Sequence, residues 1–375
     1  MDRAKRAAWC FLLATAALAL FAYAKVQVLP GLQGSVTFDG TYYSRIGQFG
    51  YQFSGDFEEK QDTAFLPLMG VMIEAARDII PGDHQLVEVA LLGFAILFAT
   101  LLGIYRLVLS HADANAARVA VALWALSPLG FYNFTGYSDP LYALMCVWVL
   151  NFIGEKRFWP ASVMAGIALL ARPQAAVLIA FVLVALLWAR RLEWRRLLAT
   201  TVPLQIAVMA FPILCLATYY AVAFGDSTVY VHSLEAWRRG SFHDGSLSLL
   251  DAVSYFVSAA SAESPVLTSW TTLLAMLSVG MGFAVLMFAL NGPRLVAAFY
   301  VASLAFLFLS ASFDAINVAR HLFFMVPWAI LAGIASARTA RTWWHQVLIL
   351  APWLLFSATI NIASVDRYYR GVWVS

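Results

Sequence analysis

Long apolar runs separated by short polar segments are the dominant pattern of this chain. The runs are continuous rather than alternating, which predicts membrane helices instead of the strands of a barrel. A helix needs about 20 apolar residues to cross a bilayer core, and shorter runs occur where function interrupts a helix. By this measure we expect about eleven spans. They are 7–28, 86–109, 117–132, 138–153, 159–171, 173–189, 198–224, 266–290, 295–312, 320–337 and 346–362.

Composition supports the same class of protein. Of the 375 residues, 62% are hydrophobic and only 12% are charged, which is too little charge for a soluble globular protein. The three cysteines all lie inside apolar runs without C-x-x-C spacing, so neither a disulfide framework nor a zinc site is indicated. We therefore expect an all-α polytopic membrane bundle in which residues 1–375 form a single integral membrane domain. Nucleic acid is not among its expected partners, whereas membrane lipids are.

The basic residues predict an orientation. If the N-terminus is inside and the spans alternate, the inner segments hold fourteen of the 24 Lys and Arg residues and only four of the 21 acids. This agrees with the positive-inside tendency. The N-terminal run also resembles a signal peptide, because Ala22-Tyr23-Ala24 is a small-x-small sequence. A retained first span is the preferred interpretation, since the rest of the chain is itself a membrane bundle.

This orientation requires that residues 64–80 do not cross the membrane. The segment opens with Phe65-Leu66-Pro67-Leu68 and carries Glu74, Arg77 and Asp78, which is typical of a helix lying in the interface. The extracytoplasmic face then has two sizeable segments, 29–85 and 225–265. The second contains His232.

Asp39 follows the first apolar run and is surrounded by Phe38, Tyr42 and Tyr43. A lone Asp at this position often caps a helix, here one that begins near Thr41. An acid among aromatic residues beside the membrane is equally a candidate for function. The sequence leaves both interpretations open.

Three further polar segments fall on the same side of the membrane. Their residues are Asn133-Phe134-Thr135-Gly136-Tyr137-Ser138-Asp139-Pro140, then Leu170-Ala171-Arg172-Pro173-Gln174, then Ser312-Phe313-Asp314-Ala315-Ile316-Asn317-Val318-Ala319-Arg320-His321. The first has ordinary turn chemistry in Gly136 and Pro140, but its polar side chains are unusually dense. Arg172 and Arg320 each need a partner beside lipid, either a carboxylate or an anionic ligand. Asp139 is the simplest partner for Arg172, and Asp314 or an acid of another loop for Arg320.

The segment around Asp39, counted here as the first polar segment, and the three further segments, counted as the second to fourth, carry a family resemblance. The chain resembles the PIG-V-type GPI mannosyltransferases and their bacterial relatives, which belong to the GT-C superfamily of lipid-linked glycosyltransferases. The similar residues begin with Phe38-Asp39-Gly40-x-x-Tyr43-x-x-Ile46-x-x-x-Gly50-Tyr51 and Ala64-Phe65-Leu66-Pro67-Leu68, and continue with Tyr137-Ser138-Asp139-Pro140, Ala171-Arg172-Pro173-Gln174 and Arg320. Phe38 stands where the family most often has Trp, and Asp139 where it most often has Glu.

The resemblance implies an inverting transfer of a sugar, mannose, from a polyprenyl-phosphate donor to a hydroxyl of a glycolipid or glycan acceptor. An in-line displacement needs a base for the acceptor proton, and Asp39 is the candidate. Arg172, Arg320 and His321 are candidates for binding the donor phosphate. The candidates for holding the substrates are Gly40, Tyr43, Tyr51, Asn133, Ser138, Asp139, Gln174 and His232.

No His/Asp cluster at ligand spacing calls for a metal, and no cofactor is expected, although the chemistry leaves room for a divalent cation. The expected location is a bacterial inner membrane with the active site facing the periplasm, or the endoplasmic reticulum membrane in a eukaryote. The alternative function is a transporter or flippase for a lipid-linked or anionic substrate, which also places charged groups within a bundle. A scaffold protein of the membrane is a third interpretation.

Overall fold

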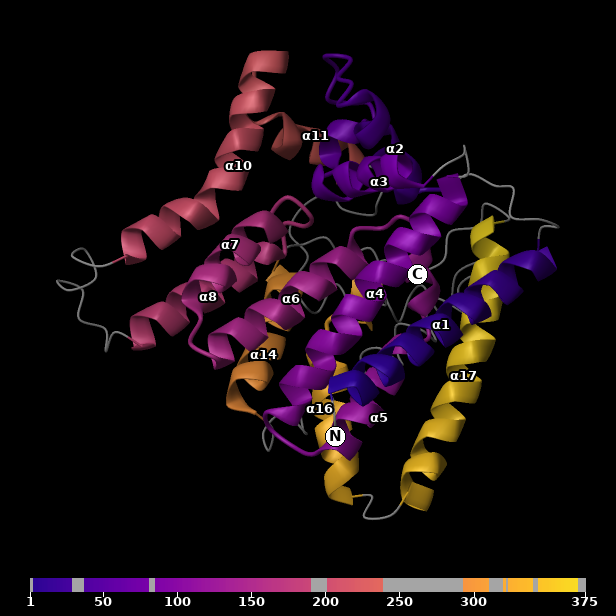
Figure 1. The fold of residues 1–375 in the computed structure, drawn as a ribbon. Helices are drawn as coiled ribbons and strands as arrows, with labels where there is room; N and C mark the ends of the chain where they lie inside the picture. Colours follow the sequence, from indigo (N-terminus) through magenta and orange to yellow (C-terminus); the bar gives the residue numbers. More distant parts are fainter. Residues whose placement is uncertain are drawn as a thin grey trace, which may run out of the picture.

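The computed structural model describes residues 3–28, 37–80, 85–189, 201–238, 293–309, 320–321, 323–339 and 343–369. All regular structure in these ranges is helical (Figure 1). The α-helices are α1 Arg3–Val28, α2 Asp39–Phe49, α3 Leu68–Ile79, α4 Gln85–Leu109, α5 Ala114–Ala125, α6 Asp139–Gly154, α7 Phe158–Ala168, α8 Ala175–Ala189, α10 Val202–Phe224, α11 Val229–Arg238, α14 Arg294–Leu309, α16 Pro327–Thr339 and α17 Trp343–Tyr369. Two short 3₁₀ turns are η1 Asp62–Ala64 and η2 Gly130–Phe134.

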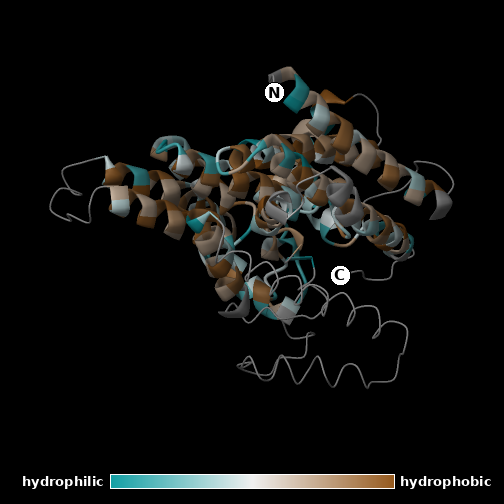
Figure 2. Cartoon of the chain, turned by 90° about the horizontal axis from the view of Figure 1, so that it is seen from below, coloured by the Kyte–Doolittle hydropathy of each residue, from teal (hydrophilic) through white to brown (hydrophobic). Residues whose placement is uncertain are grey.

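Membrane-spanning character is concentrated in three long helices of the described residues. The segment Ala4–Val26 of α1, together with α4 and α10, is long and apolar enough to cross a bilayer. Several shorter helices are also apolar, and apolar residues cover much of the helix surfaces (Figure 2). The prediction of an all-helical membrane bundle is confirmed, and the chain is an integral membrane protein. The number of spans and the division into one domain stay predictions.

Small residues bring the central helices close together. α4 packs against α5 and α6, α1 lies along α17 and α4, and α16 lies against α5. A Cβ atom added to Gly333 of α16 would lie 2.5 Å from the Cβ of Ala120, so only glycine permits this crossing. Close backbone approach through small side chains is the usual way in which membrane helices gain packing energy.

Helices α2, α3 and α11 lie together at one end of the bundle (Figure 1). α3 has 12 residues and is about 18 Å long, which is too short to cross the hydrocarbon core. Val71 and Ile79 on this helix are 57% and 80% exposed. An amphipathic helix with exposed apolar side chains suits the membrane interface, as the sequence predicted for residues 64–80.

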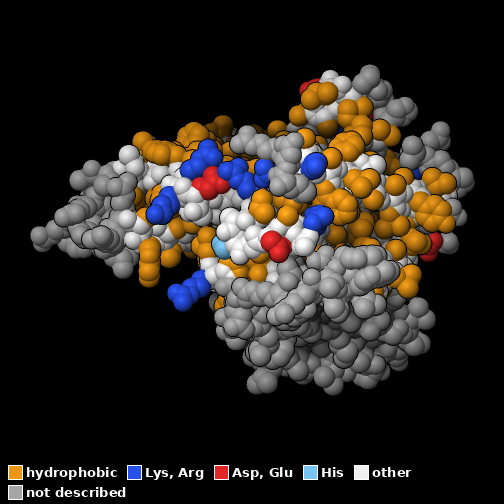
Figure 3. Space-filling model, turned by 60° about the horizontal axis from the view of Figure 1, so that its bottom comes forward, with side chains coloured by type: hydrophobic (Ala, Val, Ile, Leu, Met, Phe, Trp, Pro, Cys, Tyr) orange, Lys and Arg blue, Asp and Glu red, His pale blue; other side chains and the backbone are white. Residues whose placement is uncertain are grey.

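The opposite end carries exposed ion pairs. Glu155 pairs with Arg106 and with Arg157, whose Nη1 atom lies 3.4 Å from a Glu155 oxygen. Figure 3 brings this end forward and shows Lys and Arg side chains gathered on it. Assignment of this end to the cytoplasm remains a prediction based on the positive-inside tendency.

Two expected spans are shorter than their apolar runs. The run 117–132 is broken, because α5 ends at Ala125 and η2 follows. Pro128 lacks the N–H that would continue the helix and disfavours helical geometry at Ser127. The run 320–337 becomes helix α16 only from Pro327, for the same reason. By contrast, α17 is longer than the expected span 346–362, because the helix extends to Tyr369. The expected span 266–290 and the segments 239–265 and 310–319 lie outside the described residues.

Gly93 of α4 touches the backbone of the polar segment around Asn133. A Cβ atom there would lie 1.8 Å from the Asn133 carbonyl oxygen and 2.8 Å from its carbon. We therefore expect Gly93→Ala to lower the free energy of unfolding by about 1–3 kcal/mol, because overpacking forces the backbone to move. Thermal unfolding in detergent measures this change. Gly154→Ala is the matched control, since its Cβ would meet nothing within 4 Å, and equal losses in both variants would contradict the explanation.

Candidate active site

Asp39 is the first residue of α2. Phe38 before it has a φ of 52°, a left-handed conformation that is unusual for a bulky residue and costs free energy. The Phe38 ring packs on Tyr368 of α17 at 5.3 Å, and the Tyr368 hydroxyl donates to the Thr37 carbonyl at 2.8 Å. The far end of the chain therefore holds the start of α2 in place. The helix has no side-chain cap, so the capping interpretation of Asp39 is wrong.

The Asp39 carboxylate instead meets Arg320. The Arg320 Nη1 atom donates to Asp39 Oδ2 at 3.1 Å, and the side chains are 5% and 16% exposed. Arg320 also lies over the rings of Tyr137 and Tyr132, with its guanidinium carbon 4.8 Å and 5.6 Å from their centroids. Aromatic faces attract a cation, and the attraction is stronger where water is excluded. Arg320 is thus held by an acid on one side and by two rings on another.

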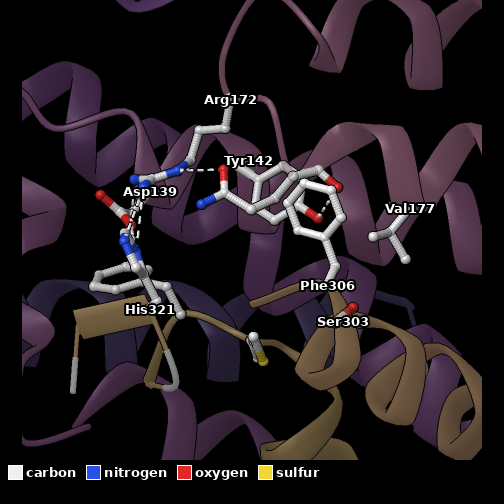
Figure 4. A pocket seen from close by; sticks show the side chains of 10 residues that line it. Asp139, Tyr142, Arg172, Val177, Ser303, Phe306 and His321 are labelled. Carbon is white, nitrogen blue, oxygen red and sulfur yellow. Dashed lines mark hydrogen bonds and ion pairs between the residues drawn. The ribbon is translucent and has the colours of Figure 1, made fainter. Parts of the chain in front are cut away.

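Asp139 connects Arg320 with the third polar segment. This acid lies in the first turn of α6, where the helix dipole favours negative charge, and its side chain is 3% exposed. Its Oδ1 atom pairs with Nη1 of Arg172, and its Oδ2 atom lies 3.6 Å from Nε of Arg320. Figure 4 shows Arg172 and His321 directed toward it. Asp139 therefore pairs with both guanidinium groups.

His321 completes the contacts around Asp139. Its Nδ1 atom lies 3.2 Å from Nη2 of Arg172 and 3.4 Å from Oδ1 of Asp139. Because Arg172 can only donate, a hydrogen bond between the two requires His321 Nδ1 to be an acceptor, as in a neutral imidazole. The cluster of Asp39, Asp139, Arg172, Arg320 and His321, here named the acid–guanidinium cluster, then has no net charge.

Burial changes the acid–base behaviour of Asp39. Removal from water raises the pKa of this carboxyl above its ordinary value, and the Arg320 guanidinium opposes the rise. The negative charge of Asp139 raises it further, and Arg172 lowers it. Asp39 is therefore a stronger base than an ordinary surface aspartate. Such a group is suited to accept a proton as a general base.

Several predicted residues lie at the edge of the cluster. The hydroxyls of Tyr43 and Ser138 are hydrogen-bonded at 2.8 Å, which ties α2 to the residue before Asp139. Arg172 Nε donates to Gln174 Oε1 at 3.2 Å. A Cβ atom on Gly136 would lie 3.6 Å from the Cα of Gly40, so the second polar segment passes close to α2. Together these contacts fix the orientation of the charged side chains.

Three other predicted residues make their contacts elsewhere in the described structure. The Tyr51 hydroxyl donates to the Phe65 carbonyl at 2.7 Å. Asn133 is buried and donates to the Gly130 carbonyl at 2.8 Å, which shapes the η2 turn. His232 Nδ1 lies 3.1 Å from Asp226 on its own segment. These contacts explain the three side chains as structural groups, because polar groups in turns satisfy nearby backbone or loop partners first.

No role was assigned from the sequence to Tyr132, Tyr137 or Tyr368, which pack beside Arg320 and Phe38. Tyr132 and Tyr137 lie within or beside a polar segment that the sequence marked, so their neighbourhood was a usable signal. Tyr368 sits near the end of α17, 331 residues from the carbonyl that it contacts. No local pattern could assign it to the site.

A hollow adjoins the cluster between α8, α14 and the segment that carries His321. Arg172 and His321 form its polar end, while Val177, Phe306 and Phe324 form apolar walls. A site with a charged end and an apolar wall fits a molecule with a charged head and an apolar tail. Among the described residues, no three or more His, Cys, Asp or Glu side chains gather at a spacing that could hold a metal ion.

The sequence matches no family model and no curated protein sequence. Its fold is similar to that of solved structures. The oligosaccharyltransferase of Archaeoglobus fulgidus, in complex with Zn and sulfate, aligns over 94% of this chain and 53% of its own at 14% identity, with a TM-score of 0.55. ArnT from Cupriavidus metallidurans, bound to undecaprenyl phosphate, aligns over 92% of this chain and 63% of its own at 20% identity, with a TM-score of 0.55.

The A. fulgidus protein AglB in complex with an inhibitory peptide and a dolichol-phosphate gives a TM-score of 0.51 at 14% identity, over 96% of this chain and 56% of that one. The chain thus spans between about half and just under two thirds of the length of these proteins. Identities this low concern the fold and not the activity. The chain therefore has an all-helical fold similar to that of these solved structures.

Proposed function

We propose that the chain is an inverting glycosyltransferase that moves a sugar from a polyprenyl-phosphate donor to an acceptor hydroxyl. The observation that carries the proposal is the contact of a buried acid, Asp39, with Arg320, in a cluster that adjoins a hollow with apolar walls. Two proteins of similar fold are reported bound to undecaprenyl phosphate and to a dolichol-phosphate. A polyprenyl phosphate has a charged head that suits the polar end of the hollow and an apolar tail that suits its walls.

The donor phosphate would lie against Arg172 and Arg320. A guanidinium binds phosphate oxygens through paired N–H groups, and such hydrogen bonds are strong where water is excluded. Each arginine is already paired with a carboxylate, so a phosphate must compete with Asp139 or Asp39 for its donors. The prenyl tail would lie along Val177, Phe306 and Phe324, on the side of the hollow formed by α8 and α14.

The chemistry follows from this placement. The oxygen of the acceptor hydroxyl attacks the anomeric carbon of the sugar from the side opposite to the phosphate. As the new C–O bond forms, the bond from the anomeric carbon to the phosphate oxygen breaks, and the polyprenyl phosphate leaves with the electron pair. Asp39 takes the hydroxyl proton as general base. Arg172 and Arg320 stabilise the negative charge that grows on the leaving phosphate.

Binding of the donor would also increase the basicity of Asp39. When Arg320 turns toward a phosphate, its attraction for the Asp39 carboxylate weakens, and this attraction is what lowers the pKa of Asp39. The acid would then become a better proton acceptor when the donor is in place. Loading of the donor and activation of the base are thereby coupled through one guanidinium group.

The resemblance of the first polar segment to PIG-V-type enzymes points to mannose as the sugar. Gly40, Tyr43, Ser138 and Gln174 border the cluster and are the candidates for contacting its hydroxyls. The site lies at the end of the bundle opposite to the basic end. The positive-inside tendency assigns the basic end to the cytoplasm, and therefore the site to the periplasm.

The test uses the purified chain in lipid nanodiscs with polyprenyl-phosphate-[¹⁴C]mannose and a cell-envelope extract as the source of acceptor. We expect labelled product that no longer carries the polyprenyl phosphate. Release of labelled mannose into water without acceptor would also support bond cleavage at this site. Donor that is recovered intact under all conditions, or only moved between leaflets of a vesicle, would overturn the proposal in favour of transport.

Arg172 offers a test of the donor site. Arg172→Ala removes a guanidinium that contacts Asp139, His321 and Gln174, and we expect the KM for the donor to rise roughly 10- to 100-fold, because a hydrogen bond to a charged group contributes about 1.5–3 kcal/mol. Initial rates against donor concentration measure it. The control is Arg106→Ala at the opposite end of the bundle. An unchanged donor KM in Arg172→Ala would mean that Arg172 serves only as the ion-pair partner of Asp139.

A further inference from the structure

A second hollow lies on the outer side of α2, between this helix and the loop that leads to η1. Its volume is about 400 Å³, which is within the range of small-ligand sites. Tyr42, Gln52, Glu59, Lys60 and Asp62 are among the residues that line it, and we name it the outer hollow. It shares no lining residue with the hollow beside Arg172.

The wall of the outer hollow is built by specific hydrogen bonds. Gln61 accepts the backbone N–H of Ser54 at 2.9 Å and donates to its hydroxyl at 2.9 Å. Asp62 Oδ1 accepts the backbone N–H of Gln52 at 3.1 Å. These bonds fix the shape of the loop between α2 and η1. Side chains that shape a loop in this way leave its concave surface preorganised for a ligand.

One carboxylate oxygen of this wall accepts no hydrogen bond from the described residues. Asp62 is 3% exposed, and its Oδ2 atom has no hydrogen-bond partner among the described residues. A buried carboxylate oxygen without a partner is costly, and a native structure that keeps one calls for an explanation. Asp62 lines the outer hollow, so its negative charge favours a ligand that donates hydrogen bonds to this wall.

The lining indicates the chemistry of that ligand. Arg45 and Lys60 are balanced by Glu59 and Asp62, so the outer hollow does not select for a strongly charged molecule. The polar side chains that line it include both donors and acceptors, and Tyr42 adds an aromatic ring. Each hydroxyl of a sugar can both donate and accept a hydrogen bond. A sugar ring carries these hydroxyls on its edge, and its C–H faces can pack against an aromatic ring.

The position of Tyr42 links the outer hollow to Asp39. The two residues are three apart on α2, so they lie on the same face of the helix, one turn from each other. The Tyr42 ring is stacked on Phe65 at 4.7 Å and meets Trp237 edge-on at 5.2 Å, which holds it in place. Asp39 does not line the outer hollow, so a ligand bound there would have to reach one helical turn along α2 to meet the acid.

We infer that the outer hollow is the acceptor subsite, and that it binds a sugar ring of a glycan acceptor whose hydroxyl reaches Asp39. The assignment of this site to the acceptor rests on the proposed function, because only a transfer reaction has an acceptor. The binding of a sugar ring beside Tyr42 and Asp62 is testable without any transfer reaction. The donor and the acceptor would then approach Asp39 from opposite sides.

The test measures binding of soluble methyl glycosides (the methyl α-mannoside, glucoside and galactoside) to the full chain in nanodiscs by saturation-transfer NMR. We expect at least one of them to bind wild-type protein. The double variant Gln52→Ala/Glu59→Ala should weaken its binding roughly ten-fold or more, since it removes two polar side chains that face the ligand. Glu58→Ala is the matched control, because Glu58 is the neighbouring acid and does not line the outer hollow.

Cleavage of the labelled donor is measured on the same samples. Donor cleavage by the wild-type protein, together with a raised acceptor KM in the double variant, supports the inference. Normal cleavage with no glycoside binding, or with binding that the double variant retains, overturns the subsite and leaves the proposed transfer standing. Glycoside binding that the double variant loses, without any donor cleavage by wild-type protein, supports the sugar site and overturns the proposed transfer instead.

Discussion

Asp39→Asn is expected to reduce the rate of sugar transfer by about 100- to 10,000-fold while the protein still folds. This is the usual contribution of a general base. The amide has the shape of the carboxyl group but cannot accept the acceptor proton. Arg320 keeps its neighbour Asp139 in the variant, so the structure around the site should persist. Initial rates with labelled donor, together with the thermal unfolding midpoint, measure the two parts of the expectation.

The pH dependence of the rate identifies the same group. Asp39 acts as a base only when ionised, and burial raises its pKa above the ordinary aspartate value. The rate should therefore fall as the pH drops through a pKa higher than about 3.9, the value of an unperturbed aspartate. The residual activity of Asp39→Asn should lack this acidic limb.

Asp113→Asn is a matched control for Asp39→Asn. Asp113 caps α5 through the N–H groups of Asn115 and Ala116, and asparagine caps a helix equally well. This variant should transfer sugar at the wild-type rate with an unchanged acidic limb. Near-normal transfer by Asp39→Asn would refute the assignment of Asp39 as the base.

Asp139→Ala is expected to destabilise the protein by about 3–5 kcal/mol, the usual cost of removing one partner from a buried ion pair. Asp139 is the shared partner of Arg172 and Arg320, and it is 3% exposed. Without it two guanidinium groups remain buried, with Asp39 as the single acid of the cluster. Thermal unfolding in detergent, with Asp139→Glu as the charge-preserving variant, measures the loss.

Glu155→Ala provides the comparison, because Glu155 also pairs with two arginines. Its partners Arg106 and Arg157 are 47% and 55% exposed, so water replaces the lost contact. Exposed pairs contribute about 0–1 kcal/mol. Similar unfolding midpoints for Asp139→Ala and Glu155→Ala would mean that the acid–guanidinium cluster is as hydrated as the opposite end.

Much of the fold was predictable because it depends on local physical chemistry. Continuous apolar runs require helices in a bilayer, and the polar segments between them identified the positions of Asp39, Asp139, Arg172 and Arg320. The errors in the predicted helix boundaries also have local causes. Pro128 and Pro327 interrupt runs that are apolar throughout, and hydropathy does not register the missing N–H.

The partners of the charged residues were not predictable in the same way. From the sequence, Arg320 was equally compatible with Asp314 and with an acid of another loop. The structure pairs it with Asp39, which lies 281 residues away. The sequence marked several residues alike as candidates for holding the substrates, among them Tyr43, Tyr51, Asn133 and His232. Of these four, the last three contact nearby loops and turns instead of the cluster.

The sequence by itself determined that this chain is a helical membrane protein and that its unusual polar groups fall in a few interruptions of the apolar pattern. Periodicity, proline and charge act over a few residues, so a linear pattern records them. Only the tertiary structure decided that the acid of the first segment, the acid of the second and the guanidinium groups of the last two form one buried cluster. That outcome depends on how helices hundreds of residues apart pack, and on Gly93 and Gly333, where any larger side chain would collide with a neighbouring backbone.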